Sequence, residues 1–236
     1  MGTNNVNEIL ESFSPLWWKC ILTIVLSIVV LVRIPLHWKS LKRRNYDIFL
    51  ALILLINILV ENLYNYKTGQ WTLQQNLPAH LCSITNILCI ILLFNYKQWI
   101  AEVIFYWGLA GGIYALLTPQ FITGTNGYNF FSYFIGHGGL LLVISYIIIH
   151  HKFRPRPKSW LWALGYSEIV AIIVWMVDYA VNANYMFLTK KPVVKNPFLI
   201  GEWPYYIIVV QLVALIHFWI FYLPFAKSNK RKLQLA

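Results

Sequence analysis

Polar side chains interrupt several long apolar runs of this sequence, and their types are those of nucleophilic or metal chemistry. A thiol, Cys82, and an imidazole, His137, each lie several residues inside such a run. A thiol becomes nucleophilic when a nearby imidazole takes its proton or stabilises the thiolate. Because polar groups are costly inside a membrane span, each one there is a candidate for a site. Five further candidates lie near the corresponding ends of their runs: Glu61, His80, Asn86, Asp178 and Asn182.

The spacing of these residues limits which of them can meet on one helix. His80 and Cys82 are two residues apart and do not share a helix face, whereas Cys82 does share a face with Asn86. The partner of the thiol must therefore come from another span, and His137 is the natural candidate. It is flanked by glycines in the segment IGHGG, and small residues let helices or a substrate approach closely. Three side chains could then orient the imidazole: Asp178, Glu61 and Asn182.

Other interpretations of the same residues stay open at this point. Cys82 could be an ordinary small buried residue, and His137 could form a hydrogen bond between helices. Asp178 and Asn182 could simply cap the end of a helix. A zinc ion could use ligands of these types. However, neither an HExxH nor a CxxC spacing is present, and no glycine motif could cradle a phosphate, so we expect neither a metal nor a soluble cofactor.

The composition predicts the kind of element that carries these side chains. Of the 236 residues, 59% are apolar and only 11% are charged, whereas soluble domains are about a quarter charged. The apolar residues fall in long runs, which are typical of membrane-spanning helices. We therefore predict an all-α, multi-pass membrane protein with about seven spans, forming one domain over residues 1–236. The predicted spans are residues 16–36, 47–64, 79–94, 99–117, 130–149, 160–181 and 204–225.

The basic residues predict how the chain lies in the membrane. The net charge is +11, and most lysines and arginines fall after the first, third and fifth runs and in the tail. Charges in short loops orient a membrane protein and attract anionic headgroups, so nucleic acid is not the expected partner. The positive-inside rule places the N-terminus outside and the C-terminus in the cytoplasm.

Four segments carry a family resemblance: LPAHLCSITN, YWGLAGGIYALLTP, FFSYFIGHGG and DYAVNANYMFLTKKP. Together they resemble the bacterial YwaF-like integral membrane family, which is related to the eukaryotic transmembrane protein 164 family. The eukaryotic members are regarded as membrane acyltransferases that move fatty acyl chains between phospholipids, with a cysteine and a histidine at the active site. The resemblance implies that Cys82 is the nucleophile and His137 its base. The wider fold resembles that of membrane hydrolases that use a threonine and a histidine.

These observations lead to two hypotheses of different classes. In the first, Cys82 takes an acyl chain from a phospholipid as a thioester and passes it to a lysophospholipid, another acceptor or water, in the outer leaflet of a bacterial plasma membrane. In the second, a lipid-binding or transport protein uses the same polar pocket without covalent chemistry. A receptor or scaffold is a weaker third possibility, which rests only on the number of spans. The sequence leaves the acyl donor, the acceptor and the oligomeric state open.

Overall fold

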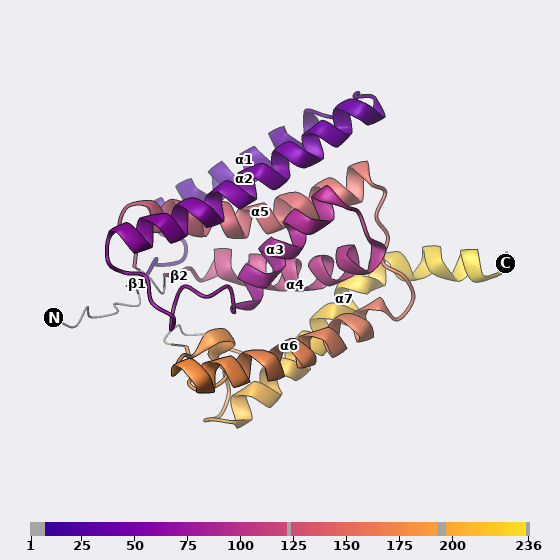
Figure 1. Ribbon diagram of the computed structural model, residues 1–236. Helices are drawn as coiled ribbons and strands as arrows, with labels where there is room; N and C mark the ends of the chain where they lie inside the picture. Colours follow the sequence, from indigo (N-terminus) through magenta and orange to yellow (C-terminus); the bar gives the residue numbers. More distant parts are fainter. Residues whose placement is uncertain (1–7, 122–123, 193–196, 235–236) are drawn as a thin grey trace.

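The apolar runs fold as helices, because only a helix satisfies its own backbone polar groups where no water is present. The structure is a computed structural model and describes residues 8–121, 124–192 and 197–234. Six of the helices in these residues are long and apolar enough to cross a membrane, which confirms the predicted helical, multi-pass membrane fold. Figure 1 shows the seven α-helices in these residues: α1 (Pro15–Arg33), α2 (Ser40–Lys67), α3 (Leu81–Phe94), α4 (Gln98–Leu117), α5 (Tyr128–His150), α6 (Ser159–Val181) and α7 (Tyr205–Gln234).

Two helices extend beyond the predicted spans. The basic segment before residue 47 was expected to be a loop, but α2 already begins at Ser40. Lysine and arginine are good helix formers, so their charge does not end a helix. The Arg44 side chain also stabilises the end of α3, because its guanidinium donates to the carbonyl oxygens of Leu93 and Phe94 at 2.9 and 2.6 Å. Similarly, α7 continues to Gln234, well past the predicted end at residue 225.

The third helix, α3, is shorter than a normal span. Its 14 residues are about 21 Å long, whereas a bilayer core is about 30 Å thick. Its Phe94 end is held by Arg44, a charged residue that belongs at the polar boundary, so the shortfall lies at the Leu81 end. The preceding residues 68–80 form no regular helix or strand. Such backbone is tolerated at membrane depth where it lines a cavity, as described below.

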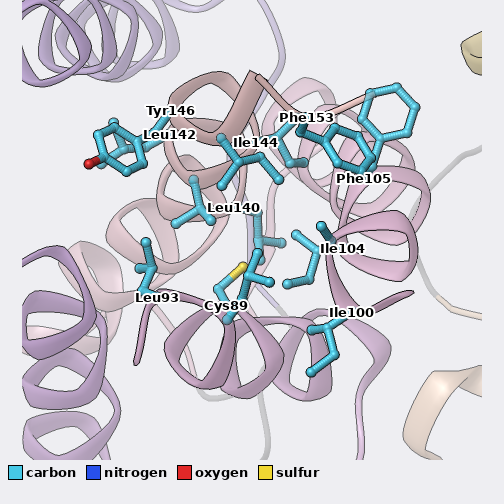
Figure 2. Close-up of a cluster of buried hydrophobic side chains, with 14 of the residues drawn as sticks. Cys89, Leu93, Ile100, Ile104, Phe105, Leu140, Leu142, Ile144, Tyr146 and Phe153 are labelled. Carbon is cyan, nitrogen blue, oxygen red and sulfur yellow. The ribbon is translucent and has the colours of Figure 1, made fainter. Parts of the chain in front are cut away.

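The most extensive helix packing is between α4 and α5, and α3 packs against both. Figure 2 shows that Cys89 of α3 points into a cluster of apolar side chains that includes Ile104 and Leu140. The thiol of Cys89 is fully buried there, which makes it part of the core. The close approach of α4 to α5 requires glycine, since a Cβ atom on Gly108 would lie 2.8 Å from Cδ1 of Ile144.

The remaining elements surround this core. In Figure 1, α1 and α2 lie on one side of α3 and α4, and α6 and α7 lie on the other. A short 3-10 helix, η1 (Tyr185–Phe187), follows α6. Near the N-terminal end of α5, the strand β1 (Glu8–Ile9) pairs antiparallel with β2 (Gln120–Phe121).

The segment after α6 is tied to the irregular segment before α3. The phenol of Tyr185 in η1 donates to the carbonyl of Leu73 at 2.8 Å and accepts the amide N–H of Leu77 at 2.9 Å. Burial raises the pKa of this phenol to about 12, so it remains a donor at neutral pH. These bonds hold residues 73–77 and η1 together beside the start of α3.

Candidate functional site

A cavity of about 560 Å³ lies among the helices, and its size suits a small organic ligand or part of a lipid. Side chains from α2 to α7 line it, together with residues 75–78, His80 and part of η1. The lining as a whole is mostly apolar. The carboxyl groups of Glu61 and Glu168 line it as well, but among the described lining residues there is no lysine or arginine.

Cys82 lines this cavity from the first turn of α3, where it is the second residue of the helix. The unpaired backbone N–H groups of a helix N-terminus favour negative charge nearby, and Cys82 lies beside those of α3. The thiol rests against α4, since a Cβ atom on Gly111 would lie only 3.0 Å from its sulfur atom. The sequence pattern predicts Cys82 three or four residues inside a span. It did not reveal that the helix itself begins only at Leu81.

His137 lines the same cavity from α5, and its hydrogen bond fixes its tautomer. The Nδ1 atom lies 2.8 Å from the carbonyl oxygen of Tyr133. A carbonyl can only accept, so Nδ1 carries the proton and Nε2 of the neutral ring carries a lone pair. The ring also packs against the Tyr133 ring, with centroids 4.2 Å apart. The imidazole is therefore held in the form that can accept a proton at Nε2.

The thiol of Cys82 and the backbone of His137 lie against adjacent glycines of α4. Gly111 contacts Cys82, while the next residue, Gly112, packs against the backbone of His137. Tyr133, which contacts the ring of His137, is also close enough to Cys82 to interact with it electrostatically. Within the described residues no hydrogen bond joins Cys82 to His137. Catalytic hydrogen bonds are often long in unliganded sites and tighten when the substrate is bound.

His80 also lines the cavity and lies close enough to His137 to interact with it electrostatically. It is the residue immediately before α3. Its Nδ1 atom accepts the amide N–H of Met186 at 3.2 Å. The ring packs against Tyr185 and Phe187, with centroid distances of 5.0 and 5.8 Å. The cavity thus has two imidazoles. Nδ1 of His80 accepts a hydrogen bond, whereas Nδ1 of His137 donates one.

Two of the expected supporting residues also reach the cavity. Glu61 accepts the hydroxyl proton of Ser132 at 2.6 Å. Asn86 donates to the carbonyl of Cys82 at 3.0 Å, one turn away on α3. The other amide atom of Asn86, Oδ1, is buried and has no hydrogen-bond partner in the part of the chain that the structure describes. Both groups therefore present acceptors in or beside the cavity.

The other two expected residues do not line the cavity. Asp178 is almost fully buried and accepts the amide N–H of Tyr185 at 2.8 Å. Asn182 follows the end of α6 in a left-handed conformation. The group that orients His137 is the Tyr133 carbonyl, whereas Asp178 holds η1, the segment that contacts His80. Within the described residues, no three histidine, cysteine or acidic side chains cluster as a metal site would require.

The structure adds lining residues that the sequence pattern did not single out. Glu168 of α6 accepts from the amide of Gln211 of α7 at 2.7 Å, and both line the cavity. Tyr114 of α4 also lines it and forms a 2.5 Å hydrogen bond with Nε2 of His217. Glu168 was noticeable as an acidic residue inside an apolar run, but nothing in the sequence pairs it with Gln211.

The fold and the cavity define a multi-pass helical membrane protein with a thiol and two imidazoles around one cavity. A sequence model of the TMEM164 family matches residues 11–222, so the chain belongs to the TMEM164 family. This confirms the expected relation to the TMEM164 family, whereas the YwaF-like bacterial branch remains a prediction. Comparisons with curated proteins and with solved structures gave no match.

Proposed function

We propose that this protein is a membrane acyltransferase that moves a fatty acyl chain from a phospholipid through a thioester on Cys82, with His137 as the base. The observation that carries the proposal is the fixed tautomer of His137, which leaves a lone pair on Nε2 of a histidine that lines the same cavity as the thiol. Membership of the TMEM164 family and the apolar character of the cavity support it. The proposed location is the outer leaflet of a bacterial plasma membrane.

The lining of the cavity offers a surface for each part of the proposed phospholipid substrate. The wall formed by α6 and α7 offers apolar side chains that suit an acyl chain, namely Leu164, Ala171, Ile207 and Val210. The same wall also carries the hydrogen-bonded pair of Glu168 and Gln211. The polar wall of the cavity is formed by α2, α3 and α5 and suits an ester group.

The first half of the reaction forms the thioester. Nε2 of His137 takes the proton of the Cys82 thiol, and the sulfur forms a bond to the ester carbonyl carbon while the carbonyl electron pair moves to oxygen. The pair then returns and the bond between the carbonyl carbon and the glycerol oxygen breaks. That oxygen takes the proton from Nε2 and leaves as a lysophospholipid.

The second half reverses these steps with another acceptor. Nε2 of His137 takes the proton of an acceptor hydroxyl, whose oxygen attacks the thioester carbonyl. The carbon–sulfur bond breaks, and the thiolate recovers its proton from Nε2. A lysophospholipid as acceptor gives acyl transfer, whereas water gives hydrolysis by the same route.

The proposal is tested by incubating purified protein with a phospholipid that has one deuterated acyl chain and with an unlabelled lysophospholipid. Mass spectrometry should find the deuterated chain on the lysophospholipid and, after rapid acid quenching, on the peptide that contains Cys82. Both signals should vanish in Cys82→Ala. His137→Ala should lose at least about a hundredfold in rate, the size of a general-base contribution.

The opposite outcome favours the second hypothesis. If the folded protein binds the phospholipid but neither transfers its chain nor forms an adduct across a broad lipid panel, the cavity serves lipid binding or transport. The thiol would then be a lining residue only. Cys20→Ala, which alters a cysteine outside the cavity lining, is the matched control and should keep the wild-type rate.

A further inference from the structure

His80 and His137 line one cavity as opposite tautomers. The Met186 amide can only donate, so the Nδ1 atom of His80 that accepts from it bears no proton. The ring of His80 is therefore neutral and carries its proton on Nε2. His137 has the reverse arrangement, with its proton on Nδ1. One ring is thus prepared to accept a proton and the other to donate a hydrogen bond.

We propose that His80 is a further catalytic residue, whose Nε2–H donates a hydrogen bond to the oxyanion that forms when Cys82 attacks an acyl carbonyl. This inference rests on the proposed function and adds the group that stabilises the charged intermediate. No hydrogen bond to a described residue uses the Nε2–H of His80, so this donor is free for the substrate.

The position of His80 suits this role. It directly precedes α3, and Cys82 lies two residues later in the first turn. The oxyanion formed at Cys82 therefore lies by the helix N-terminus, where the backbone dipole also favours negative charge. Donors fixed in advance around a developing oxyanion in a water-poor site are worth more than the same donors in water.

The surroundings of His80 hold its ring in place. Tyr185 and Phe187 contact the ring from η1, and Asp178 anchors the backbone of η1. Met186, which supplies the N–H to Nδ1, has a positive φ of 53°, a conformation that costs energy for a residue with a side chain. The surrounding contacts maintain this conformation and with it the tautomer of His80.

Two substitutions of His80 distinguish a hydrogen bond that it donates to the substrate from a contribution that it makes to the fold. In His80→Asn the side-chain oxygen can replace Nδ1 as the acceptor for Met186, but no N–H reaches the position of Nε2. In His80→Gln the longer side chain can place its amide N–H near that position. Two rates are measured for each variant and for the wild type. One is the rate at which a phospholipid forms the thioester on Cys82, and the other is the rate at which iodoacetamide alkylates Cys82.

Alkylation is the control because it consumes the same thiol without forming an oxyanion. We expect His80→Asn to lose about a hundredfold to a thousandfold in acylation, as for loss of one oxyanion donor, and His80→Gln to lose less than about tenfold. Alkylation of Cys82 should stay within about twofold of wild type in both.

A rate of acylation in His80→Gln that is less than tenfold above that of His80→Asn overturns the inference. A fall in alkylation parallel to acylation also overturns it, because His80 would then act on the thiol or the fold. Absence of acylation in the wild type, with normal alkylation, instead contradicts the proposed function itself. The two failures are therefore distinguishable.

Discussion

The Nδ1 atom of His137 lies 2.8 Å from the carbonyl oxygen of Tyr133, one turn earlier on α5. A backbone carbonyl thus does for this histidine what a carboxylate does in many triads, namely fix the tautomer and the direction of the ring. The carbonyl cannot be removed by substitution of a side chain. The histidine itself can be changed.

His137→Gln should slow both acylation and alkylation of Cys82 at pH 7, because the amide cannot take the thiol proton. We expect acylation to fall by about a hundredfold or more. Raising the pH should restore alkylation, since hydroxide then removes the proton. Alkylation rates on the Cys82 peptide between pH 7 and pH 10 measure this. Equal rates in the variant and the wild type at pH 7 would exclude His137 as the base.

Gly111→Ala should displace the thiol. The new methyl group would lie 3.0 Å from the sulfur of Cys82, so the side chain must move, and small displacements of a reacting group are costly to rate. We expect acylation to fall about tenfold or more while the protein remains folded. Gly165→Ala on α6 is the control, since no atom lies within 4 Å of the added Cβ. It should leave the acylation rate unchanged, and a similar loss in both variants would refute the argument.

Asp178→Ala and Asp178→Asn should differ in acyl transfer. Asparagine keeps the oxygen that accepts the Tyr185 amide N–H, whereas alanine leaves this buried group unpaired at a cost of about 1–3 kcal/mol. We expect the alanine variant to lose about tenfold because η1 no longer holds His80, and the asparagine variant to stay near wild type. A large loss in the folded asparagine variant would show that the negative charge itself is required.

Arg156→Gln should reduce stability more than Glu102→Gln. The two side chains form a hydrogen-bonded ion pair, in which the Glu102 side chain is 5% exposed and that of Arg156 is 60% exposed. Without Arg156 a buried carboxylate loses its partner, at a cost of about 3 kcal/mol, whereas Arg156 without Glu102 can be hydrated. Thermal unfolding in detergent compares the two variants. The reverse order would contradict the explanation, and acylation by the folded fraction should be unchanged in both.

The sequence predicted the helices well because long apolar runs leave the backbone few choices. The predicted ends of α1, α4, α5 and α6 agree with the observed ends to within a few residues. The start of α3 was harder, since Ala79 and His80 continue the pattern of the run although the helix begins only at Leu81. The orientation of the chain in the membrane and its bacterial location remain predictions.

The site was only partly predictable. Side-chain types drew attention to Cys82, His137, His80, Glu61 and Asn86, and the structure places all five around or beside one cavity. The role of Asp178 was not predictable, because its partner is the backbone of Tyr185, whose position depends on the turn after α6. Nor could a sequence show that Tyr133 would orient His137 through its carbonyl.

The short length of α3 has a consequence for how the proposed reaction would be measured. Since the short α3 keeps the thiol within the membrane-spanning part of the fold, the proposed lipid substrate would reach it by diffusing sideways within its leaflet, without leaving the bilayer. The relevant substrate concentration is then the mole fraction of the lipid in the membrane. Adding more vesicles of the same composition would leave the rate unchanged, whereas diluting the lipid with an inert one would lower it.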